Sequence, residues 1–517
     1  MSNTSKDHLF TLVKSLNKAE KRNFKLYANR LQSGSESKFL KLFDALDRLT
    51  EYEEDQLLRK LKGVNKRNLA NLKRHLYKQI LISLRLIYIN KNIDIQIREQ
   101  LDFARILYGK GMYMQALRLL ERIKLIALEH HQDILHLEIL EFEKLIEARH
   151  ITRSRSVENK MESLLEESSR RSFVTHTTSL LSNLNIQVQG WYIQHGHVQR
   201  PEDFTEIKAY FDSIFPDNFK LENLTFFDKI HLFQAFMWYH YIRLELQEAR
   251  DHAEKWVKLF EKNPQMQEKD PNLYMRGLYY QLIFIFLQQD FQAFSGVLQR
   301  FEKFHRENRR QLNANAQMTA FVYLYLSRLN EKLLVGDFKA GLQLVPDIHR
   351  SIRTFSAHMD MHRVLLFHYK IGALHFATGQ YAEALDELNK ITVLHSGFLR
   401  DDLHFNARIL HLICHFELGH FELLEYLVPQ VQRAIKKGRE VSAWQLATLN
   451  FLRRLLRASR TRQHELFLEF KHETKPLLEN AYECKFLRYL DIPAWVECHL
   501  NACSLQDYYR EVRENVD

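Results

Sequence analysis

The chain has little glycine, proline or cysteine. Its 517 residues contain 15 Gly, 8 Pro and 4 Cys. Because sheets and barrels of this length need many turn residues, so few glycines and prolines favour long uninterrupted helices. A hydrophobic content of 45% beside 27% charged residues is typical of a folded chain. We therefore predict an all-α protein that is too long for one compact core.

Long apolar runs are also missing. The most apolar windows, such as residues 79–89 and 279–287, fall well short of the roughly 20 residues that a membrane-spanning helix needs. The N-terminal sequence MSNTSKDHLFTLVKSLNK lacks the basic segment, apolar run and cleavage site of a secretory leader. The 4 cysteines all lie in the last fifth of the chain, which fits reduced thiols. We expect a cytoplasmic protein with no membrane partner.

Motifs for nucleotide, cofactor or acyl-transfer chemistry do not occur. The sequence contains no GxxxxGK[ST] phosphate loop, no GxGxxG fingerprint and no GxSxG elbow. Carboxylates such as Asp401 with Asp402, and Glu383 with Asp386 and Glu387, fall at expected helix starts or on exposed faces. Capping or solvation explains them there. We expect no enzyme activity, no catalytic residue and no cofactor.

Histidine is abundant, with 26 copies, and imidazoles are metal ligands. Two pairs have the i, i+4 spacing that places both rings on one helical face: His358 with His362, and His411 with His415 beside Cys414. Either pair could bind a metal ion, but no HExxH or CxxC motif accompanies them. Because chance spacing on helix surfaces is common in a histidine-rich chain, we assign no metal site from the sequence.

Positive charge is concentrated near the N-terminus. The whole chain has a net charge of +10, yet residues 1–92 carry +11, from 20 Lys and Arg against 9 acidic residues. Residues 56–93 contain ten basic side chains and no acidic one. Such asymmetry suggests a polyanionic partner, either nucleic acid or a ribosomal surface. We predict that residues 1–92 form a basic helical domain.

Apolar periodicity predicts four helices in this domain, over residues 7–31, 39–49, from the acidic run at 51–55, and over 66–89. The last helix has one apolar face, formed by Leu69, Leu72, Leu76, Ile80, Leu84 and Ile87. The opposite face carries Arg67, Asn71, Arg74, Lys78 and Arg85. A basic ridge with an amide can contact phosphates and a base edge or sugar, so these five are candidate polyanion-binding residues. The alternative is a solvated Lys/Arg face on a packed helix, which is commoner in proteins.

Helical hairpins follow from about residue 94. The clearest is residues 371–388, IGALHFATGQYAEALDEL. Gly372 and Ala384 lie where its two helices would approach, Gly379 lies in the turn, and Tyr381 follows it. The same spacing recurs at Ala104, Gly111, Tyr113 and Ala116. Turn and aromatic positions recur at Gln289 with Phe291, Gly336 with Phe338, and Gly419 with Phe421.

This pattern resembles the tetratricopeptide repeat, which has small residues at the matching positions and an aromatic after the turn glycine. The resemblance implies a TPR-like α-α superhelix. The turn points from residue 289 to 419 are 47, 43 and 40 residues apart, longer than the family's repeat of about 34 residues. We therefore predict an irregular solenoid over residues 93–517, with a capping hairpin from about residue 466. Polar residues over 149–178 predict a longer loop or an irregular hairpin, and Gly190 and Gly196 flank another expected turn.

Two functions from different classes fit this organisation. Arrays of helix pairs present an extended concave surface, so the leading hypothesis is a non-catalytic interaction scaffold that binds a protein or peptide through the solenoid. The alternative is a regulator, or a ribosome- or nucleic-acid-associated factor, that uses residues 56–93 while the solenoid senses a ligand or partner. This arrangement resembles that of peptide-responsive bacterial transcription regulators, which join a small DNA-binding domain to a tetratricopeptide array. The sequence decides neither the partner nor the oligomeric state.

Overall fold

The fold is known from a computed structural model. It describes residues 7–30, 38–61, 64–150, 159–216, 224–355, 359–393, 401–436, 442–488 and 490–514. The structure is 85% helical, and no strand occurs in these ranges. The prediction of an all-α protein is therefore confirmed. None of the helices described is long and apolar enough to cross a membrane.

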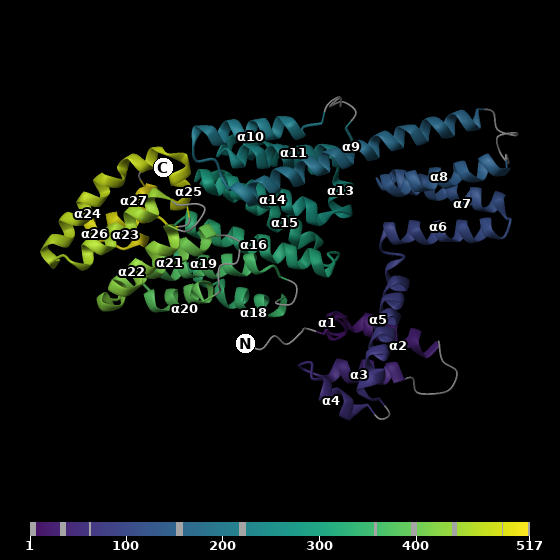
Figure 1. The fold of residues 1–517 in the computed structure, drawn as a ribbon, viewed down its shortest axis with the longest axis horizontal. Helices are drawn as coiled ribbons and strands as arrows, with labels where there is room; N and C mark the ends of the chain where they lie inside the picture. Colours follow the sequence, from purple (N-terminus) through teal and green to yellow (C-terminus); the bar gives the residue numbers. More distant parts are fainter. Residues whose placement is uncertain are drawn as a thin grey trace. The chain divides into compact units, whose positions relative to one another are not determined.

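The chain divides into two compact units, Met1–Thr177 and Thr178–Asp517. In Figure 1 unit 1 runs from purple to blue and unit 2 from teal to yellow. One long helix, α9 (Lys160–His195), runs across the division. The expected boundary near residue 92 stays a prediction.

Unit 1 begins with five helices that share a core. They are α1 (His8–Ser15), α2 (Lys18–Arg30), α3 (Lys38–Arg48), α4 (Glu54–Lys60) and α5 (Lys66–Tyr88). Helix α5 packs against α1, α2 and α3. The side chains of Phe24, Phe43 and Leu76 are almost fully buried between them. The apolar face predicted for α5 is thus the face that holds this bundle together.

The single helix expected over residues 7–31 is wrong, because the chain breaks into α1 and α2 after Ser15. The backbone N–H of Glu20 donates to Asn17 Oδ1 at 2.9 Å, and that of Asn17 donates to Glu20 Oε2 at 2.8 Å. These reciprocal bonds satisfy donors that a new helix would otherwise leave unpaired. The local capping interaction therefore starts a new helix at this point, although the apolar pattern continues through it.

The rest of unit 1 contains α6 (Ile93–Gly109), α7 (Tyr113–Glu129), α8 (Asp133–His150) and the start of α9. Helix α7 packs on both α6 and α8. Of the two alternatives predicted over residues 149–178, the longer loop is wrong from residue 160 onward, where α9 begins. Polar side chains of α9 pair with carboxylates, a lysine and a histidine of α7 and α8. The pairs are Lys160 with Glu143 (2.8 Å), Lys124 with Glu167 (2.9 Å), His136 with Glu167 (2.9 Å) and Arg171 with Asp133 (2.7 Å).

Unit 2 consists of successive helices. They are the end of α9, α10 (Pro201–Ile214), α11 (Phe226–Ile242), α12 (Leu246–Glu261), α13 (Pro264–Lys269), α14 (Pro271–Gln288), α15 (Phe291–Asn308), α16 (Ala314–Leu334), α17 (Phe338–Leu342), α18 (Val345–Phe355), α19 (Met361–Ala377), α20 (Tyr381–Thr392), α21 (Asp401–Glu417), α22 (Phe421–Lys436), α23 (Ala443–Leu456), α24 (Arg460–Thr474), η2 (Lys475–Glu479), α25 (Ala481–Leu487), α26 (Ile492–Asn501) and α27 (Leu505–Glu514). Most contacts join helices that are neighbours in sequence, as in α11 with α12, α19 with α20 and α21 with α22. Figure 1 shows these helices side by side. The superhelical solenoid stays a prediction.

Most of the turns named from the sequence share a left-handed backbone. The φ angle is +76° at Gly111, +69° at Gly336, +75° at Gly379, +73° at Gly419 and +61° at Gln289. Gly196 also has a positive φ and ends α9, whereas Gly190 lies inside that helix, so the turn expected between them is wrong. Glycine is favoured at such positions because a Cβ atom strains a left-handed backbone.

The small and aromatic residues of the repeat pattern lie at the helix contacts in most cases. Ala104, Ala116 and Ala384 are fully buried. A Cβ added to Gly372 would lie 3.2 Å from Leu388. The rings that follow the turns vary: Tyr113 stacks on His150 at 3.7 Å, Tyr381 contacts Phe376, Phe338 is buried and Phe421 is 46% exposed.

The final helices fold back on the preceding array. Helix α26 packs on α24 and α27, and Trp495 Nε1 donates to Glu417 Oε1 at 2.6 Å. Tyr509 of α27 reaches the turn before α17, where its ring meets Phe338 edge-on. A Cβ on Gly336 would lie 2.6 Å from the Tyr509 Cβ. The absence of a side chain at Gly336 therefore makes room for the C-terminal helix. The capping hairpin from about residue 466 stays a prediction.

Candidate functional site

The first candidate site is the basic face of α5, formed by Arg67, Asn71, Arg74, Lys78 and Arg85. All five side chains are exposed, whereas Leu69, Leu76 and Ile80 on the opposite face are buried. The helix starts at a capping box in which Asn65 and Asn68 satisfy each other's backbone N–H. Tertiary packing and a local cap thus hold this face toward solvent.

The cations on the basic face of α5 have no acidic partner among the described residues. Among the residues that the structure describes, no carboxylate lies within ion-pair distance of its three arginines or of Lys78, and Arg74 bonds only to Asn71, at 3.3 Å. The neighbouring Lys66 and Lys73 differ, because they pair with Asp55 and Asp7. Unpaired, exposed cations of this kind can neutralise phosphates.

A second surface, in unit 2, is one that the sequence reasoning missed. Rings and guanidinium groups from α9, α11, α14, α16 and α19 form a continuous row. We call it the tyrosine–arginine row; its members are Tyr192, Trp238, Arg276, Tyr279, Tyr280, Tyr323 and Arg363. Ring centroids are 5.3 Å apart for Tyr192 and Trp238, 5.8 Å for Trp238 and Tyr280, and 4.2 Å for the stacked Tyr279 and Tyr323. Except for Tyr279, which is buried, every member is partly exposed.

Two arginines lie against the rings of this row. Arg363 Cζ lies 5.3 Å from the ring centres of both Tyr279 and Tyr323, and its Nη1 donates to the Tyr279 hydroxyl at 3.0 Å. Arg276 Cζ lies 5.6 Å from the ring centre of Tyr280. In the part of the chain that is described, neither guanidinium has a carboxylate within ion-pair distance. Partly buried positive charge that lies against tyrosine rings and hydroxyls favours the approach of an anionic group.

Of the two histidine pairs named from the sequence, the structure describes one completely. His358 lies outside the described residues, so the pair with His362 cannot be followed. The rings of His411 and His415 lie 4.6 Å apart, but His411 bonds to Asn389 and His415 to His420. Burial lowers the pKa of His411 to about 4, and Cys414 is fully buried in the core.

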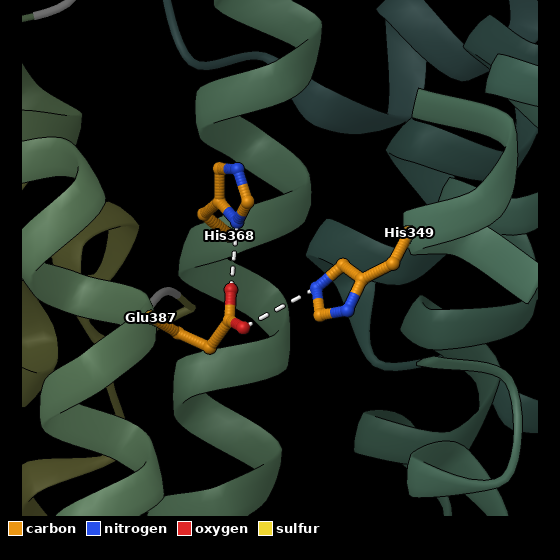
Figure 2. Close-up of side chains that lie close together, drawn as sticks. All are labelled: His349, His368 and Glu387. Carbon is orange, nitrogen blue, oxygen red and sulfur yellow. Dashed lines mark hydrogen bonds and ion pairs between the residues drawn. The ribbon is translucent and has the colours of Figure 1, made fainter. Parts of the chain in front are cut away.

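A different histidine cluster forms in unit 2 around Glu387, with His349 and His368 (Figure 2). Glu387 was expected on an exposed face; that prediction is wrong, because it is only 5% exposed. Burial alone would raise the pKa of Glu387, but hydrogen bonds from His368 and Lys390 outweigh it and lower that pKa to about 2. The three residues are spaced by 19 along the chain, so no local motif marks them.

Comparisons of the chain with models of protein families, with curated proteins and with solved structures find no match. The resemblance to tetratricopeptide proteins therefore rests on the residues of the repeat alone.

Proposed function

We propose that the chain is a non-catalytic interaction scaffold that binds an acidic protein or peptide segment through the helix array of unit 2. The tyrosine–arginine row is the proposed binding surface. One observation carries the proposal: two partly buried guanidinium groups, unpaired with any described carboxylate, lie among rings contributed by α14 and α16.

The chemistry of the row suits a protein partner. Tyr, Trp and Arg are the residue types that dominate the energetics of protein interfaces, because they bury a large area and keep a polar group. An Arg held on a tyrosine face is already ordered and partly desolvated, so an incoming carboxylate meets a preorganised donor. A segment that crosses several helices could place apolar groups on the rings and an Asp or Glu near Arg276 or Arg363.

The test is selection of peptides from a random library on the full-length protein, followed by affinity measurement. We expect the selected peptides to be enriched in Asp and Glu. The double variant Arg276→Gln/Arg363→Gln should bind them at least about tenfold more weakly. Arg300→Gln is the matched control, because Arg300 lies on α15 and already pairs with Glu261 at 2.9 Å.

Two results would refute the proposal. One is a set of selected peptides without acidic enrichment, and the other is an equal effect of the double variant and Arg300→Gln. Circular dichroism of each variant shows whether the fold is retained.

A second function is favoured by a separate observation, the exposed basic face of α5, whose cations pair with no described carboxylate. We propose that this face binds nucleic acid through the phosphate backbone, with Asn71 placed to reach a base edge or sugar. Phosphate contacts release counterions, so the affinity should fall steeply with salt.

The measurement is binding of full-length protein to labelled duplex DNA and single-stranded RNA between about 50 and 200 mM salt. Reversal of Arg67, Arg74, Lys78 and Arg85 to Glu should weaken binding and reduce the salt slope by about 3 to 4. The control changes the net charge equally at four exposed cations of unit 2 that already have acidic neighbours: Lys208, Lys258, Arg350 and Arg510. Equal loss in both quadruple variants would mean that only net charge matters, and unchanged affinity would show that the face is merely solvated.

A further inference from the structure

Three potential metal ligands converge in unit 2 from three consecutive helices. His349 comes from α18, His368 from α19 and Glu387 from α20 (Figure 2). His349 Nε2 lies 3.2 Å from Glu387 Oε1, and His368 Nδ1 lies 2.7 Å from Glu387 Oε2. One ligand atom from each residue lies within 4.8 Å of the others.

We propose that His349, His368 and Glu387 bind a divalent metal ion of the zinc class. Two imidazoles and one carboxylate are a common zinc ligand set, which leaves a fourth position for water or another ligand. With ligands about 2.0 to 2.2 Å from the metal, the ligand atoms of a tetrahedral site lie roughly 3.3 to 3.6 Å apart. The His349–Glu387 distance is already close to this value, and the widest separation needs to close by only about 1 Å.

His349 supplies an independent reason to expect a ligand. Its Nε2 atom is buried and makes no hydrogen bond to any described residue, since the approach to Glu387 lacks hydrogen-bond geometry. A buried polar atom without a hydrogen bond costs free energy. A metal ion between the rings and the carboxylate would satisfy this nitrogen and would link α18 to the α19–α20 hairpin.

Lys390 is the competing cation. Its Nζ lies 2.7 Å from Glu387 Oε1, so it partly neutralises the carboxylate. The Lys390 side chain is 45% exposed, so it can turn into solvent when a metal ion enters. Lys390→Met removes this competitor and leaves the three ligands in place. The variant therefore distinguishes two cases. A metal site should bind its ion more tightly without Lys390, whereas an ion cluster that depends on Lys390 should be weakened.

The experiment is titration of chelator-treated, full-length protein with Co²⁺, followed by displacement with Zn²⁺. We expect one equivalent to bind with the intense visible absorption of tetrahedral Co²⁺ and to be displaced by Zn²⁺. His349→Ala/His368→Ala should abolish this absorption, and Lys390→Met should bind Co²⁺ several-fold more tightly. His375→Ala is the control, because this α19 imidazole bonds to Gln380 outside the cluster, and it should bind like wild type.

The proposal is overturned if the double variant retains the absorption or if His375→Ala loses it equally, because the surface histidines would then be responsible. Hydrogen exchange of wild-type protein provides a readout that does not depend on the double variant being folded. Zn²⁺ should slow exchange across residues 345–392 in wild type and at a lower concentration in Lys390→Met. Unchanged exchange in that segment would also overturn the site.

Discussion

The contact between α19 and α20 at Gly372 can be tested by adding side-chain volume there. A Cβ on Gly372 would lie 3.2 Å from both Cγ and Cδ2 of Leu388, and 3.6 Å from the carbonyl oxygen of Ala384. Leu388 and Ala384 are fully buried. Because Leu388 has little room to move away, Gly372→Ala compresses the interface slightly and Gly372→Val forces two further methyl groups into it.

The expected cost follows from two opposing effects. Replacing a helical glycine with alanine contributes about 1 kcal/mol of helix propensity, which roughly offsets the tight contact of one Cβ. Overpacking a filled core costs about 1 to 3 kcal/mol. We therefore expect Gly372→Ala to be nearly neutral and Gly372→Val to destabilise the α19–α20 pair by about 2 kcal/mol.

Hydrogen exchange with mass spectrometry measures this effect locally in the full-length protein, which is preferable because a chain of two units need not unfold in one step. A loss of 2 kcal/mol corresponds to exchange about 30-fold faster in α19 and α20. Leu388→Ala should relieve the clash, so Gly372→Val should cost about 1 to 2 kcal/mol less in that background. Fully additive effects, or an unchanged exchange rate in Gly372→Val, would refute the close packing of these helices.

Three further predictions concern the turns and buried polar groups of unit 2. Gly379→Ala should cost about 1 kcal/mol through backbone strain alone, seen as faster exchange at the turn, because φ is +75° and nothing lies within 4 Å of an added Cβ. Glu483→Gln should lower the melting temperature and cost about 2 kcal/mol, because the carboxylate accepts the backbone N–H groups of Ala443 and Trp444 at the start of α23; an unchanged melting temperature would argue against that cap. Burial lowers the pKa of His411 from 6.5 to about 4, so the unfolded chain binds the proton more readily, and stability present above pH 6.5 should be lost as the pH falls toward 4. Denaturation at pH 7 and pH 4.5 should show about 2 kcal/mol more loss in wild type than in His411→Gln, and equal losses would contradict the assignment.

Local pattern predicted much of the secondary structure. The apolar residues of α5 recur every three or four positions, and that spacing places its basic residues on the other face wherever the helix packs. The turn at Gly379 was also readable, because a glycine between two periodic segments is typical of a helix end. The loop that polarity suggested is wrong over residues 160–178, because Lys160, Glu167 and Arg171 pair with side chains of α7 and α8. Hydropathy carries no information about such partners.

The sequence by itself determined the fold class, the helix over residues 66–88 with its two faces, and the turns at Gly111, Gly336, Gly379 and Gly419. Each of these depends on residues within a few positions of one another. Only the tertiary structure decided which helix faces meet. It placed His349 and His368 beside Glu387, set Arg363 against Tyr279, which lies 84 residues earlier, and brought Tyr509 to Gly336. Such contacts depend on how many helices pack against one another, and the spacing of residues along the chain carries no information about that packing.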